Sequence, residues 1–476
     1  MVAATPEPNP DPILALVKPE AQPAGEVADG EKRSDLAATG GPTAGRTTLD
    51  EAKRKGPAGI LQLLGPGLIT GASDDDPSGI GTYSQVGSQF GYGLLWLALF
   101  TFPLMSAVQE LCARIALQTG VGLGASLQRK FPRLVVGLAI MGLVAANTFN
   151  VGADLGAVAA GGSLLSRGAL QAVWLVVPVA LVIISLQVFA TYATIFKIFK
   201  WLTLALFAYV ITAFFAHPPL LDVFKATVIP HIELSKEFIM ALVAVLGTTI
   251  SPYLFFWQAS SEVDELAAAG ATNPQAGRRG LKRGELRAAR ADVMIGMAFS
   301  NLVMYFIILT SAAVLHAHGK TDVQTADQAA AALAPIAGPF AFIVFSVGLI
   351  GAGLLAIPIL TGSATYAIKE FLGLPGSLAS KPQHRPTFYL ILTLATAAGV
   401  VMNFMHLDPI RALFISAVIN GVVAPPLLLL IVLLGADAAV MRRYVSGKLS
   451  LALTGIATIF MAVAAITMFV TMFAGH

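Results

Sequence analysis

Long apolar segments dominate the sequence from Leu61 to the C-terminus, and they limit what the chain can fold into. A transmembrane helix needs about 20 mostly apolar residues, and roughly eleven segments of that kind follow one another, separated by short polar loops. With 56% apolar and only 12% charged residues, most of this chain must be solvated by lipid. These segments are too long for the strands of a barrel, and every backbone polar group in a bilayer must be paired, so we predict an all-α membrane protein.

The segments divide the chain into a short tail and one transmembrane domain. We predict spans at residues 58–90, 92–117, 134–162, 169–191, 198–216, 238–260, 291–315, 338–367, 387–404, 409–434 and 449–473. Residues 58–476 would then form the transmembrane domain. Residues 1–57 have no apolar run and are rich in Pro, Ala, Gly and charged residues, so we expect a disordered cytoplasmic tail without the pattern of a signal or transit peptide.

The positions of the basic residues predict the orientation. With the N-terminus in the cytoplasm, most Lys and Arg residues fall in cytoplasmic loops, as the positive-inside rule requires. The opposite loops would carry only Arg167, Lys225, Lys236, Lys320 and Arg411. The basic segment at 278–290 fits a cytoplasmic loop better than a nucleic-acid patch. We expect a monomer in the plasma membrane of a bacterium, with its C-terminus outside, surrounded by lipid and binding no nucleic acid.

Two of the spans contain sequences that disfavour a continuous helix. The first reads GPGLITGASDDDPSGIGTYSQ, and its glycines, Pro77 and mid-span carboxylates predict unwinding from Ser73 to Ser78. The sixth reads AVLGTTISPYLFFWQ, where Gly247, two threonines and Pro252 predict a second break. Broken first and sixth spans are typical of two inverted halves of about five helices each, here with one extra helix, and of a substrate site between the breaks.

The carboxylates within the spans are the strongest functional signal, because a charge at this depth is costly and usually functional. Away from helix ends they are Asp74, Asp75, Asp76, Glu110 and Asp154. Consecutive aspartates in an unwound segment point in different directions, so one or two of the first three should meet a substrate. Asp76, beside Pro77, is the strongest ligand candidate. Asp74 and Asp75 either meet the substrate in the cavity, or cap the half-helix that follows or lie at the mouth of the cavity.

Oxygen atoms should supply the other contacts at the breaks. We expect the carbonyls of Ser73 and Thr248 and the hydroxyl of Ser251 to join Asp76. Such hard ligands suit Mg²⁺, Ca²⁺ or Mn²⁺ better than Cu⁺ or Zn²⁺, and Mg²⁺ would keep much of its water. Every histidine falls in a loop or at the terminus, and the single cysteine, Cys112, excludes a thiolate cluster. We therefore expect no cofactor, and the divalent ion would be the substrate.

Three other polar positions each admit two interpretations. Asp154, with Asn150 one turn before it, either lines a route for protons or hydrated ions or is a buried residue that bonds within the bundle. The side chain of Asn420 either reaches the site or forms a hydrogen bond with a neighbouring helix. Glu110 should pair with Arg114, four residues later, rather than take part in transport.

At these residues the chain resembles the NRAMP family of divalent metal transporters, from about Gly65 to the end of the tenth span. GPGLITGASDDDPSG resembles the family's first-helix signature, which ends in Asp-Pro-Gly-Asn, and the stretch GYGLLWLALFTFPLMSAVQELCARIALQTG is similar to its second helix. Asp154-Leu155-Gly156 resembles its third-helix Asp-Leu-Ala, and Ser251-Pro252-Tyr253 falls where the family has Met-Pro-His. The resemblance implies the LeuT-like fold, with helices one and six unwound, and uptake of metal ions.

The departures from the family pattern bear on the choice of ion. The family's metal-binding Asp is kept as Asp76, but the Asn three residues later is Gly79 and the Met is Ser251. A thioether is a soft ligand that favours transition metals, so a hydroxyl should remove that preference, and the site should be larger. Both changes look like the NRAMP-related magnesium transporters. They imply that Mg²⁺, and also Mn²⁺, is taken up partly hydrated.

The departures also bear on proton coupling. Asp154 is kept, but the family's acidic residue three positions later is Ala157, and its sixth-helix His is Tyr253. We therefore expect transport with weak or no proton coupling. The alternatives are a proton-coupled Mn²⁺/Fe²⁺ symporter and, less favoured, a sodium-coupled amino-acid carrier, whose substrate carboxylate the aspartates would repel. An enzyme is not expected, since no span pairs a nucleophile with a base and no cofactor motif is present.

Overall fold

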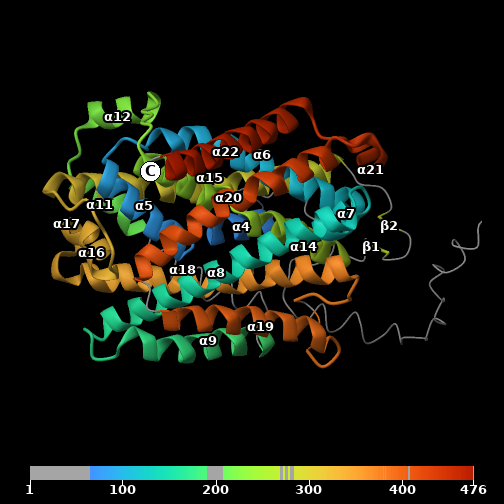
Figure 1. Cartoon of the computed structure of the whole chain (residues 1–476), viewed down its shortest axis with the longest axis horizontal. Helices are drawn as coiled ribbons and strands as arrows, with labels where there is room; N and C mark the ends of the chain where they lie inside the picture. Colours follow the sequence, from blue (N-terminus) through green and yellow to red (C-terminus); the bar gives the residue numbers. More distant parts are fainter. Residues whose placement is uncertain are drawn as a thin grey trace, which may run out of the picture. The chain divides into compact units, whose positions relative to one another are not determined.

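The computed structural model describes residues 65–189, 207–268, 272–273, 277–278, 283–378, 380, 382–405 and 408–474. Almost all of them lie in helices, as predicted (Figure 1). The α-helices are α4 (Pro66–Asp74), α5 (Pro77–Phe90), α6 (Trp96–Thr119), α7 (Leu123–Gln128), α8 (Arg133–Leu165), α9 (Ala172–Phe189), α11 (Phe207–Phe215), α12 (Leu220–Val228), α13 (Lys236–Thr249), α14 (Pro252–Ala268), α15 (Arg283–Val314), α16 (Ala326–Ala330), α17 (Ala334–Ala337), α18 (Ala341–Leu372), α19 (Pro386–Met402), α20 (Pro409–Gly435), α21 (Ala438–Met441) and α22 (Lys448–Ala474). Short 3-10 helices lie at His316–His318, Ala331–Leu333, Gly338–Phe340, Asn403–Met405 and Arg442–Tyr444, and strands β1 (Thr272–Asn273) and β2 (Gly277–Arg278) form a small antiparallel pair.

The described helices match the predicted spans. Eight helical segments in this part of the chain are long and apolar enough to cross a membrane, α19 is a shorter apolar helix, and α4 with α5 forms the first span. The predicted tail, the first residues of the first span and residues 198–206 of the fifth lie outside the described residues. The chain is therefore a multi-pass membrane protein.

One predicted boundary is wrong. The basic segment at 278–290 was expected to be a loop, but α15 begins at Arg283. Its first turns contain Glu285, Leu286, Arg287 and alanines, which favour helix strongly, so the seventh helix continues past the apolar segment.

Both predicted helix breaks are present. In the first span α4 ends at Asp74 and α5 begins at Pro77, so only Asp75 and Asp76 lie outside helices, a shorter interruption than the predicted one. In the sixth span α13 ends at Thr249 and α14 begins at Pro252. Each second half thus starts with a proline at its first helical position, where no intrahelical N–H bond is lost.

Each broken span packs backbone to backbone against a continuous helix. α4 crosses α15 at Gly71 and Gly296, where a Cβ added to Gly71 would lie 2.1 Å from the carbonyl oxygen of Gly296. α13 crosses α20 in the same way, since a Cβ on Gly247 would lie 2.1 Å from the carbonyl oxygen of Ala417. Small residues at such crossings allow close packing of helices in lipid. The first half of each broken span is therefore held by close backbone contact with a continuous helix.

The connecting elements gather at two ends of the bundle. Figure 1 shows α12, α16 and α17 at one end and α7, α21, β1 and β2 at the other. At the second end Lys130 Nζ lies 2.7 Å from Asp437 Oδ2, and this contact, with the N–H of Ala439, lowers the pKa of the Asp437 carboxyl below its usual value.

Cys112 lies on α6 and is buried in the hydrophobic core, as expected of a packing residue.

Candidate cation site at the helix breaks

Asp76 caps the second half of the first span. Its backbone is extended (φ −69°, ψ 171°), and its Oδ1 accepts hydrogen bonds from Ser78 Oγ at 2.6 Å and from the N–H of Gly79 at 2.7 Å. Its Oδ2 accepts from Asn150 Nδ2 at 3.1 Å and lies 3.5 Å from the hydroxyl of Tyr253. One carboxylate oxygen is thus held firmly by the start of α5. The other is held more weakly and has capacity for a further partner.

Tyr253 connects the two breaks. It lies in the first turn of α14, and its buried hydroxyl donates to the carbonyl of Ser73 at 2.9 Å, besides its long contact with Asp76. Its own carbonyl accepts from Ser363 Oγ of α18 at 2.7 Å. The Ser73 carbonyl, a predicted ligand, therefore already accepts one hydrogen bond and has one lone pair left.

The predicted ligands of the sixth span lie at the end of α13. Ser251 Oγ donates to the carbonyls of Gly247 at 3.1 Å and Thr248 at 2.7 Å, so this hydroxyl caps the half-helix and keeps its lone pairs as acceptors. Thr248 Oγ1 is buried and has no hydrogen-bond partner among the described residues. A Cβ added to Gly79 would lie 3.2 Å from that oxygen, so Gly79 is a point where the first and sixth spans meet.

Asp74 and Asp75 face α15. Ser300 Oγ lies 2.6 Å from Asp74 Oδ2 and 3.4 Å from Asp75 Oδ1, and its single hydrogen serves one of them at a time. The other oxygens, Asp74 Oδ1 and Asp75 Oδ2, are buried without a partner in the described part of the chain. Neither residue caps α5, so that alternative is wrong for both, and Asp76 makes the cap instead.

Asp154 and Asn420 are buried without hydrogen bonds to other described residues. Asn150 lies between Asp76 and the tenth span, because Ser416 Oγ donates to its Oδ1. One alternative from the sequence was that the side chains of Asp154 and Asn420 hydrogen-bond to neighbouring helices. No such hydrogen bond is found among the described residues.

The site is lined by acidic side chains and is closed to solvent. The carboxylates of Asp74, Asp75, Asp76 and Asp154 are at most 1% exposed. Within the described residues none of them forms a salt bridge, and no three acidic, histidine or cysteine side chains converge as a metal cluster. Buried charges need compensation, so the arrangement suits a cation held by one or two carboxylates together with neutral oxygens.

Sequence reasoning missed two hydroxyls of the site, Ser300 and Ser416. Each lies on a continuous helix that packs against a broken one, and Ser300 lies one turn after the Gly296 crossing on α15. A serine one turn from a glycine on an apolar helix is a weak but usable signal that the same face meets polar groups.

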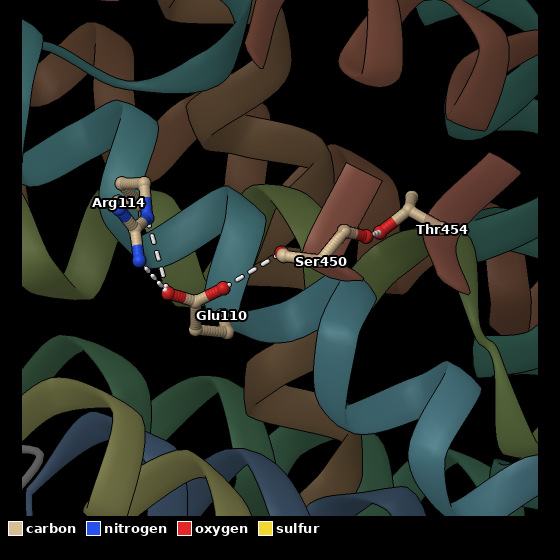
Figure 2. A network of polar contacts seen from close by, with 4 residues as sticks. All are labelled: Glu110, Arg114, Ser450 and Thr454. Carbon is tan, nitrogen blue, oxygen red and sulfur yellow. Dashed lines mark hydrogen bonds and ion pairs between the residues drawn. The ribbon is translucent and has the colours of Figure 1, made fainter. Parts of the chain in front are cut away.

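Glu110 and Arg114 form a separate network (Figure 2). Arg114 donates to Glu110 Oε1, and Ser450 Oγ donates to Glu110 Oε2 at 2.8 Å. Figure 2 also shows Thr454, whose hydroxyl donates to the carbonyl of Ser450 at 2.9 Å. The predicted pairing is confirmed, and the network attaches α22 to α6 instead of serving the site.

Comparisons with known proteins agree with this architecture. A family model described as natural resistance-associated macrophage protein-like, Nramp, matches residues 67–471. The divalent metal cation transporter MntH of Klebsiella pneumoniae is 27% identical over 360 residues, which is 75% of this chain and 82% of that protein. A crystal structure of the Eremococcus coleocola manganese transporter superposes with a TM-score of 0.66 at 17% identity, covering 87% of this chain and 88% of the other. The nucleobase-cation-symport-1 family transporter Mhp1 gives 0.54 at 15% identity over 86% and 90%. These structures share the predicted LeuT-like fold.

Proposed function

Because the chain belongs to the Nramp family over residues 67–471, we propose that it carries divalent metal cations across the membrane, with Mg²⁺ as the preferred ion and Mn²⁺ as a second. The divalent metal cation and manganese transporters that it resembles support the substrate class. They are transporters, and the chain is not an enzyme.

The observation that carries the proposal is the state of Asp76 Oδ2. This oxygen lies at a helix break with only a 3.1 Å and a 3.5 Å contact, while Oδ1 is fixed by two short hydrogen bonds to α5. The cap orients the carboxylate, and Oδ2 supplies the charge that attracts the cation. The carbonyls at the ends of α4 and α13 add the negative ends of two helix dipoles.

The neutral groups at the breaks favour Mg²⁺ that keeps part of its water. The carbonyls of Ser73 and Thr248 each accept an internal hydrogen bond, and the Ser251 hydroxyl donates to one of them. A cation that keeps its water meets such groups through water molecules, which suits Mg²⁺ because it sheds its hydration shell reluctantly. Gly79 contributes no side-chain ligand to the site, and Ser251 offers no soft sulfur.

We propose that transport is driven mainly by concentration and membrane potential. A potential of 100 mV contributes about 2.3 kcal/mol per charge, or about 4.6 kcal/mol for a divalent ion. Of the family's proton-handling positions only Asp154 is acidic here. The second candidate is a proton-coupled Mn²⁺ symporter, and the buried Asp154 carboxylate without a hydrogen-bond partner among the described residues is the observation that favours it.

Uptake by the purified protein in liposomes, with Mg²⁺, Mn²⁺ or Ca²⁺ outside and a pH-sensitive dye inside, tests the proposal. We expect saturable Mg²⁺ uptake that a negative internal potential accelerates and that leaves internal pH unchanged. Asp437→Asn is the matched control, since that carboxylate lies outside the site, at the N-cap of α21. Mn²⁺ uptake with acidification, and no Mg²⁺ uptake, would establish the symporter instead.

We also propose the orientation and setting of the protein. The excess of Lys and Arg in loops at the end that carries α7 and α21 supports a cytoplasmic position for that end. The C-terminus of α22 then faces the outside of a bacterial plasma membrane, and the protein works as a monomer in contact with lipid.

A further inference from the structure

Helix α12, in the connection between the fifth and sixth spans, has three distinct faces. Val223 is 7% exposed and packs inward with Thr227, whose hydroxyl lies 3.0 Å from that of Tyr305 on α15. On a second face, the large side chains of Leu220, Leu221, Phe224 and Val228 are exposed. Asp222 and Lys225, three residues apart, lie on the third face and are exposed too. With 3.6 residues per turn these faces are adjacent sectors of one cylinder.

The exposed apolar face is larger than a loop surrounded by water would be expected to have. Leu220 is 78% exposed and Phe224 65% exposed, and the apolar surface continues through Ile229, Ile232 and Leu234 beyond the helix. Contiguous apolar patches of this kind mark contact with a membrane or another protein. Isolated exposed apolar residues would need no such explanation.

The position of α12 in the fold selects lipid as the partner. The preceding helix, α11, ends with Phe214 and Phe215 exposed, so the apolar belt of the bundle reaches within a few residues of Leu220. α12 packs against α6 and lies at the end of the bundle in Figure 1. A helix at the boundary between bilayer and water needs an apolar face toward lipid and a charged face toward water. α12 has both, and its third face packs on the protein.

We propose that α12 is an interfacial helix that binds the surface of the bilayer. Its Phe224 face enters the boundary between lipid headgroups and acyl chains, and its Asp222 and Lys225 face meets water. The contacts of Val223 and Thr227 set its rotation, so the apolar face is directed away from the bundle. Because α12 leads by a short segment into α13, the membrane surface fixes one end of the broken sixth span.

Site-directed fluorescence in liposomes tests this placement. The chain has a single cysteine, Cys112, which is buried, so one introduced cysteine is labelled selectively. Phe224→Cys and Val228→Cys report on the apolar face, and Asp222→Cys and Lys225→Cys on the same helix are matched controls. Each variant carries a bimane label and is exposed to lipids brominated near the headgroup and, separately, to iodide in the buffer.

We expect bromolipids to quench the labels at Phe224 and Val228, with blue-shifted emission, and iodide to quench those at Asp222 and Lys225. Equal quenching of all positions by iodide would place the helix in water and overturn the proposal. Protection of the Phe224 label from both quenchers would show that protein, such as a second copy of this chain, covers the face and would overturn it too. The metal transport assay is independent of these readouts.

Discussion

The carboxylate of Asp292 holds the N-terminus of α4, and its removal should release this half-helix, which ends at the first break. Asp292 is buried on α15, and its two oxygens accept hydrogen bonds from the N–H groups of Gly65 at 2.9 Å, Gly67 at 2.7 Å and Leu68 at 3.1 Å. Hydrogen bonds to a charged group contribute about 1.5–3 kcal/mol each. Asn at this position keeps one oxygen acceptor but turns an NH₂ group toward donors.

We therefore expect Asp292→Asn to weaken the closed position of α4 by about 3 kcal/mol, or about a hundredfold in the equilibrium between closed and released α4. The assay is the rate at which a cysteine at Ala72, buried near the end of α4, reacts with a charged thiol reagent added from the α7 side. Asp437→Asn is the control, because Asp437 also caps a helix, accepting from the N–H of Ala439 at 2.8 Å, but it lies away from α4.

A second variant tests the same displacement of α4 in case Asp292→Asn does not fold. A Cβ at Gly67 would lie 2.5 Å from the backbone nitrogen of Val293, so Gly67→Ala must push α4 from α15 and should also speed the labelling of the cysteine at Ala72. Both variants should bind cation from the α7 side more readily. If labelling stays as slow as in the parent for two folded variants, α4 does not move as this reasoning requires.

Three further outcomes follow from the site. Asp76→Ala should abolish transport by a protein that still purifies as a folded monodisperse species; retained uptake in liposomes would remove Asp76 from the site. Ser251→Met should raise the Mn²⁺ to Mg²⁺ uptake ratio, and adding Gly79→Asn should raise it further at some loss of thermal stability, because a Cβ there lies 3.2 Å from a Thr248 oxygen; an unchanged ratio contradicts the ligand assignment. Tyr253→Phe removes a donor worth about 1 kcal/mol and should slow Mg²⁺ uptake without loss of expression; wild-type rates would show that this hydroxyl does not position the site.

The sequence predicted most of the fold because lipid leaves few choices. Apolar length fixes the spans, and the glycines, threonines and prolines in the first and sixth spans predicted that both would break. It overestimated the first break because it began the second half-helix at residue 79, whereas Asp76 caps α5 and Pro77 is its first residue. The sequence prediction placed the start of the seventh helix too late, because it was based on the length of the apolar segment. The first residues of α15 are polar and helical, so that criterion does not detect them.

The candidate site was predicted less completely. The mid-span carboxylates and the helix breaks pointed to Asp76 and Ser251, the family resemblance agreed, and the structure places both at the breaks. The bond from Tyr253 to the Ser73 carbonyl, and the role of Ser300 beside Asp74, depend on how helices from distant parts of the chain are packed. No local pattern encodes such contacts, so they require the structure.

Calorimetric titration of Mg²⁺ into the purified protein tests the central claim most directly. The account predicts saturable binding to the parent and to Asp437→Ala, and loss of that binding in Asp76→Ala. Undiminished Mg²⁺ binding by a folded Asp76→Ala protein would contradict the claim that the carboxylate at the first helix break holds the ion.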